Sequence, residues 1–110
     1  MFTTEMHGNV LVMSPPAELV VSRSEEAKAF LTATVEDGHS QLVVDLAKMT
    51  FIDSSGLGVL IGAKKVANNA GGDVRLCGLS PQVQTIFQLT RLDRVFKTFA
   101  TSDQAVASFD

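Results

Sequence analysis

The chain has 110 residues, of which 45% are hydrophobic and 19% are charged, a composition typical of a globular domain and not of a disordered chain. The formal net charge is −3, and the basic residues occur singly or as the pair Lys64-Lys65. This distribution excludes the basic stripe that nucleic-acid binding requires. We therefore expect a single domain over residues 1–110 that binds no nucleic acid.

Cysteine content and hydropathy indicate where the protein works. Cys77 is the only cysteine, so no disulfide can form within the chain, as is typical of a reducing compartment. The first residues lack the basic and then apolar order of a signal peptide, and no apolar run approaches the ~20 residues of a membrane span. We expect a cytoplasmic protein with no membrane segment, in which Cys77 is buried as a small apolar residue.

The first half of the chain predicts a hairpin, a helix and a buried strand, in that order. Apolar-rich runs at 1–6 and 9–14 flank His7-Gly8 and predict a β-hairpin. Helical spacing follows and ends at Asp37-Gly38. The nearly continuous apolar run QLVVDL at 41–46 then predicts a strand buried on both faces.

The start of this first helix has two candidate caps. Ser22 or Ser24 can accept a hydrogen bond from a free N–H group of the first turn. Glu25 and Glu26 follow closely and suit the positive end of the helix dipole. We therefore expect the helix to begin at one of these two serines.

The second half continues the alternation of strands and helices. The predicted elements are a helix from Asp53-Ser54 to about Ala70, a strand at 73–77, a helix from Ser80-Pro81 with Val83, Ile86, Phe87 and Leu89 on its apolar face, a strand at 95–99 and a helix from Thr101 or Ser102 to Phe109. This alternation predicts an α/β fold, a mixed four- to five-stranded sheet with helices packed mainly on one face.

The start of the second helix, Asp53-Ser54-Ser55-Gly56, is the most informative segment. Asp and Ser at this position have a plain explanation, because their oxygens accept the free N–H groups of a first helical turn. Helical geometry adds that residues three and four apart share a face. The face that starts at Ser55 is apolar and should lie on the sheet, whereas the face that starts at Ser54 should be exposed. The first face contains Val59, Ala63, Val66 and Ala70, and the second contains Gly58, Gly62, Lys65 and Asn69.

Gly58 and Gly62 need a reason, because a glycine inside a helix costs about 1 kcal/mol relative to alanine. One reading is that they let a neighbouring helix of the same chain pack closely. The other is that they leave a flat surface for another protein. A phosphate on Ser54 would lie at a helix N-terminus, which favours an anion, so modification could repel a partner without unfolding the domain.

At this point the sequence resembles a known family, the stand-alone STAS domains of bacterial anti-sigma-factor antagonists. The resemblance runs from about Leu42 to Val106. Its centre is a strand followed by Asp-Ser-Ser-Gly-Leu-Gly, and the Gly-Gly, Cys-Gly-Leu-Ser-Pro and Leu-Asp stretches follow in the expected order.

The resemblance implies a switch controlled by phosphorylation. The family's acceptor serine directly follows the aspartate and corresponds to Ser54. An anti-sigma factor that is itself a GHKL-type serine kinase phosphorylates it, and a PP2C-type phosphatase removes the phosphate. The unphosphorylated form sequesters the anti-sigma factor and so frees a sigma factor. The protein would then be a substrate and not an enzyme, of open oligomeric state, with a partner surface made of Asp53, Ser54, Ser55, Gly56, Gly58, Gly62 and Lys65.

The first half of the chain departs from the family pattern. Many relatives have Glu-Leu-Asp before the first helix, whereas here Glu18-Leu19 is followed by Val20. The partner could therefore be a target other than a sigma factor. A STAS module that binds constitutively, or that binds a small ligand, is the alternative.

Enzymatic readings fit the sequence less well. The spacing of Gly56, Gly58 and Gly62 is one residue too long for the nucleotide-binding pattern GxGxxG. A serine hydrolase needs GxSxG and a histidine partner, but here the glycines follow the serines. The two histidines and one cysteine lie far apart in sequence, so we expect neither a metal site nor a cofactor.

Overall fold

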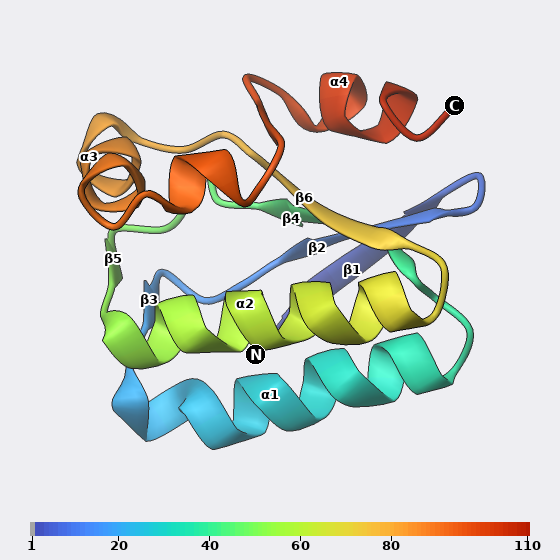
Figure 1. The fold of residues 1–110 in the computed structure, drawn as a ribbon, viewed down its shortest axis with the longest axis horizontal. Coiled ribbons are helices and arrows are strands. Elements are labelled where there is room, and N and C mark those ends of the chain that lie inside the picture. The colour runs from blue at the N-terminus through green and yellow to red at the C-terminus, as the bar shows by residue number, and fades with distance from the viewer. Residues whose placement is uncertain (1) are drawn as a thin grey trace.

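The computed structural model describes residues 2–110, so Met1 of the first predicted strand lies outside it. Strands and helices alternate along most of the chain (Figure 1). The elements are β1 (Thr3–His7), β2 (Val10–Ser14), β3 (Glu18–Leu19), α1 (Val21–Glu36), β4 (Gln41–Asp45), β5 (Phe51–Ile52), α2 (Ser54–Asn69), β6 (Asp73–Cys77), α3 (Pro81–Leu89), the 3-10 helix η1 (Leu92–Arg94), β7 (Thr98–Phe99) and α4 (Ser102–Ala107).

The main sheet has five strands in the order β1-β2-β4-β6-β7. β1 and β2 form an antiparallel hairpin, and the other neighbouring pairs are parallel. The predicted mixed sheet is therefore confirmed. β3 and β5 form a separate parallel pair that the sequence did not predict, because two-residue strands show no periodicity.

The helices lie mainly on one face of this sheet, as predicted. α1 and α2 run side by side across that face, and α4 lies on the other side (Figure 1). The two faces of β4 show the division, since Leu42 and Val44 pack in the larger core with α1, α2 and α3, whereas Val43 packs under α4. Both sets are fully buried, which explains the continuous apolar run of this strand.

The start of α1 differs from the prediction. The helix begins at Val21, and its N-cap residue, Val20, offers no side-chain hydrogen bond. Ser24 instead donates its hydroxyl back to the carbonyl of Val21, and Glu25 and Glu26 fall beyond the first turn. The predicted serine cap and the predicted interaction of Glu25 and Glu26 with the helix dipole are therefore wrong. A residue distant in sequence caps this helix instead, as described below.

Three smaller features also differ. The hairpin turns at Gly8-Asn9, where Gly8 has φ +63° and His7 still pairs with Val10. The last strand shrinks to the two residues of β7, because residues 95–97 follow η1 as a turn and bend instead of extended backbone. Leu89 is 79% exposed at the end of α3 and does not belong to that helix's buried face. The predicted cap of α3, Ser80, is confirmed, and of the two candidates for the start of α4 the cap is Thr101.

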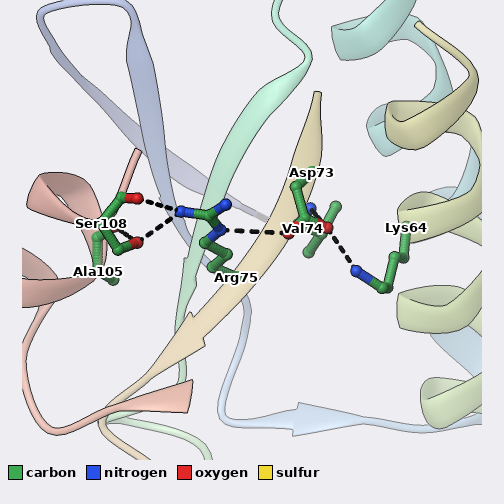
Figure 2. A network of polar contacts seen from close by, with 6 residues as sticks. All are labelled: Lys64, Asp73, Val74, Arg75, Ala105 and Ser108. Atoms are coloured by element: carbon green, nitrogen blue, oxygen red, sulfur yellow. Dashed lines mark hydrogen bonds and ion pairs between the residues drawn. The ribbon is translucent and has the colours of Figure 1, made fainter. Parts of the chain in front are cut away.

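A chain of polar contacts joins α2, β6 and α4 (Figure 2). The Lys64 ammonium lies 2.5 Å from Asp73 Oδ1, and Arg75 Nε donates to Asp73 Oδ2 at 3.2 Å. Arg75 also donates to the carbonyl and the hydroxyl of Ser108, and its guanidinium lies 4.0 Å from the ring centre of Phe109. Burial raises the pKa of Asp73, but the hydrogen bonds from Lys64 and Arg75 outweigh it, so the pKa is below its usual value.

Candidate functional site

Asp53 holds the N-termini of two helices. Its Oδ1 accepts a hydrogen bond from the Gly56 N–H at 3.0 Å, which is the expected cap of α2. Its Oδ2 accepts one from the Val21 N–H at 3.1 Å, which caps α1 from 32 positions away in the sequence. The Asp53 N–H donates to the carbonyl of Leu19 in β3. The backbone that leads into Ser54 is therefore tied to both α1 and the β3–β5 pair.

Gly56 allows the close packing of this corner. A Cβ at Gly56 would lie 2.3 Å from the Leu19 carbonyl oxygen and 2.7 Å from Ile52 Cγ1. No side chain fits there, so this glycine is needed for α2 to approach β3 and β5. Gly56 is buried beneath its own chain, and we therefore remove it from the expected partner surface.

Ser54 is the first residue of α2 and is exposed, as predicted. Its hydroxyl makes no hydrogen bond to any of residues 2–110. Two large apolar side chains are exposed close to it: Phe51 of β5, at 49%, and Val21 at the start of α1, at 67%, whose N–H donates to Asp53. The start of α2 lies at one end of the molecule (Figure 1), and there the accessible hydroxyl of Ser54 adjoins exposed apolar side chains.

Ser55 does not head the core-facing stripe that the sequence predicted. It is half-buried and lines a groove between α1 and α2. Of the predicted stripe, Val59 and Ala63 are buried, Val66 is half-buried and Ala70 is exposed at the helix end. The buried side of α2 is therefore turned slightly about the helix axis from the predicted stripe, and Leu57, Leu60 and Ala67 complete it.

The groove between α1 and α2 has a volume of about 530 Å³. A Cβ added at Gly58 or at Gly62 would meet nothing within 4 Å. The two glycines are therefore not needed for close helix packing, and that reading of the sequence is wrong. Their missing side chains leave the groove open. Its apolar floor consists of Leu31, Val59, Ala63 and Val66.

The second wall of the groove comes from α1, and sequence reasoning missed it. Glu25 and Lys28 lie on this wall, and Lys65 lies opposite them on α2. Lys28 and Lys65 are exposed, and neither forms an ion pair with another of residues 2–110. The helical pattern could only show that these α1 residues face away from the core, because their neighbours on α2 lie some 35 positions away in the sequence. The remaining α1 residues of the groove are Ser24 and Thr32.

Other candidate chemistry is sparse. Within residues 2–110, no three His, Cys, Asp or Glu side chains gather closely enough to hold a metal ion. Cys77 is fully buried under α4, as expected, and burial together with the nearby Asp45 raises the pKa of its thiol to about 12. The helices of the described chain are all too short or too polar to cross a membrane.

The chain belongs to the STAS domain family, whose model matches residues 1–105. The sheet order, the capped α2 and the Asp-Ser-Ser-Gly segment thus fall within a family match that spans almost the whole chain.

Named relatives make the comparison more specific. An anti-sigma F factor antagonist of Paenibacillus polymyxa is 25% identical over 107 residues, covering 96% of this chain and 92% of the relative. A crystal structure from Thermotoga maritima, of a candidate anti-sigma factor antagonist, matches with a TM-score of 0.92 at 25% identity, covering 97% of this chain and 92% of the other. The structure of the Bacillus cell fate determinant SpoIIAA in its phosphorylated form has the same fold, with a TM-score of 0.76 at 23% identity and all of each chain covered.

Proposed function

We propose that the protein is an anti-sigma factor antagonist whose binding is switched by phosphorylation of Ser54. In this proposal the unphosphorylated form binds and sequesters an anti-sigma factor and thereby frees a sigma factor for transcription. The observation that carries it is an exposed Ser54 hydroxyl at the start of a well-capped helix, beside a groove that two glycines keep open. The family and the names of its relatives support the general role.

The local structure supports phosphate as the switching group. A phosphate on Ser54 would add a charge of about −1.5 to −2 at the positive end of α2, where the helix dipole favours an anion. Ser54 is exposed, so the added group would displace no packed segment. An acidic partner surface would then be repelled, and an apolar one would have to bury the phosphate charge, so either would lose affinity by roughly a hundredfold. The fold is shared with SpoIIAA in its phosphorylated form.

The proposal assigns the protein partners but no catalysis of its own. The kinase would be the anti-sigma factor, of the GHKL type, and a PP2C-type phosphatase would reverse the reaction. The protein would serve both as substrate and as binding partner, acting in the cytoplasm where sigma factors meet RNA polymerase. The partner surface would include Asp53, Ser54, Ser55, Gly58, Gly62 and Lys65.

Incubation with the anti-sigma factor kinase and ATP, followed by mass spectrometry, tests the acceptor. We expect one phosphate on Ser54 and none on the Ser54→Ala variant, while Ser55→Ala is still modified. In binding assays Ser54→Asp should weaken the complex about a hundredfold, and Ser54→Ala should retain it. Equal affinity of the unmodified protein and both variants would refute the switch.

One observation favours a second candidate, a STAS module that binds a target other than an anti-sigma factor, or a small ligand, without a phosphate switch. Val20 occupies the N-cap position of α1, where the family resemblance has an acid, and Val21 beside it is exposed. The surface next to Ser54 is thereby more apolar than it would be with the acid of the family pattern at position 20. Absence of phosphate from Ser54 in the kinase assay would favour this candidate.

A further inference from the structure

We infer that the groove between α1 and α2 receives an acidic amphipathic segment of the protein partner. Apolar side chains of the segment would lie on the groove floor, and its carboxylates would pair with Lys28 and Lys65. The inference rests on the proposed function, because it describes which part of the partner meets the face beside Ser54.

The shape of the groove is the first argument. Its floor is apolar, and Leu31, Val59 and Ala63 are at most 6% exposed, so they offer a well-packed base rather than loose side chains. The space above Gly58 and Gly62 is empty. Each of these glycines lowers helix stability, and the fold shows no packing benefit in return. A row of apolar side chains from a helical or extended segment fits a groove of this size and lining.

Charge is the second argument, and it selects the occupant. The chain carries a net charge of −3, yet Lys28 and Lys65 stand on opposite walls of the groove without an ion pair among residues 2–110. Their neighbour Lys64 differs, because Asp73 pairs with it. Two unpaired ammonium groups across an apolar floor complement a segment with apolar residues at its centre and carboxylates at its edges.

The position of Ser54 links this occupant to the switch. Ser55 and Glu25 line the groove, and Ser54 directly precedes Ser55 at the start of α2. A phosphate there would add negative charge at the end of the groove that already has the Glu25 carboxylate. An acidic segment would be repelled, whereas a basic segment would be attracted. Repulsion of the occupant by phosphate is what the proposed switch requires.

Binding of the purified anti-sigma factor kinase, measured by calorimetry, tests the inference. Gly62→Leu fills the groove and should weaken binding at least tenfold, while Asn69→Leu, at an exposed position of α2 outside the groove, should not. Lys65→Glu should weaken binding about tenfold at low salt and less at high salt, whereas Lys97→Glu, exposed elsewhere, should change it less than twofold. Circular dichroism would establish that each variant is folded.

The outcomes separate this inference from the proposed function. If Gly62→Leu and Lys65→Glu bind like the unmodified protein while Ser54→Asp does not, the groove inference is overturned and the switch stands. If the groove variants lose affinity but Ser54→Asp does not, the groove is the docking site and the switch is overturned. Tighter binding by Lys65→Glu would show that the occupant is basic and would overturn the inference. Failure of the unmodified protein to bind the kinase would overturn both.

Discussion

Replacing Gly58 by alanine should stabilise the fold, an unusual result for a residue in a proposed binding site. Alanine is more favourable than glycine inside a helix by about 1 kcal/mol. No opposing steric cost arises, since the new Cβ at Gly58 would meet nothing within 4 Å. For a chain of this size, a gain of about 1 kcal/mol corresponds to a rise in Tm of roughly 4 °C.

Gly56 in the same helix provides the matched control. There the same substitution would bring a Cβ to 2.3 Å from the Leu19 carbonyl oxygen, which is backbone and cannot turn away. We expect Gly56→Ala to lower the free energy of unfolding by about 1–3 kcal/mol or more, as in overpacked cores. The gain in helix propensity is the same for both variants, so the difference between their free energies of unfolding measures the steric cost of a Cβ at Gly56 relative to the open space at Gly58.

Urea denaturation of both variants, followed by circular dichroism, gives the two free energies of unfolding. An unchanged m-value would show that the change lies in the folded state's stability and not in the exposed surface of the unfolded chain. If Gly58→Ala proved as destabilising as Gly56→Ala, the groove would be filled in solution, and the argument from open space would fail.

Three further predictions concern other contacts. Asp53→Ala removes one cap from each of two helices and should lower the free energy of unfolding by about 1–3 kcal/mol in urea titrations, with Asp53→Asn less affected; equal stability would show that these bonds do not stabilise the fold. The pKa of Asp73 is lowered in the folded protein, so its carboxylate stabilises the fold above the unfolded pKa of 3.8, and this contribution is lost as pH falls through the lower folded pKa. Asp73→Asn should therefore lower the free energy of unfolding at pH 7 and make it depend less on pH in the acid range. Parallel pH profiles of the free energy of unfolding for the two proteins would contradict this. Burial and a thiol pKa of about 12 predict that Cys77 reacts with a thiol reagent at pH 8 only as fast as the chain opens, so rapid labelling of the native protein would disprove the packing of α4.

Local patterns in the sequence were sufficient for most of the fold. The hairpin, though not the register of its turn, the buried run of β4 and the cap at Ser80 depend on residues that are close in the chain, so spacing and residue type reveal them. Ser54 was correctly expected to be exposed at the start of α2 for the same reason, because a cap and a helical period define both its position and its face.

Contacts between distant segments could only come from the tertiary structure. α1 begins at Val21 because Asp53 accepts its N–H, and no local pattern around Ser22 or Ser24 records that bond. The β3–β5 pair is too short to show a period, and whether Gly58 faces a neighbour or open space depends on how far α1 lies from α2. The sequence alone thus determined the order of the longer helices and strands and the family resemblance. The groove between α1 and α2 exists only once the two helices lie side by side on the sheet, because its walls belong to residues that no short-range periodicity connects.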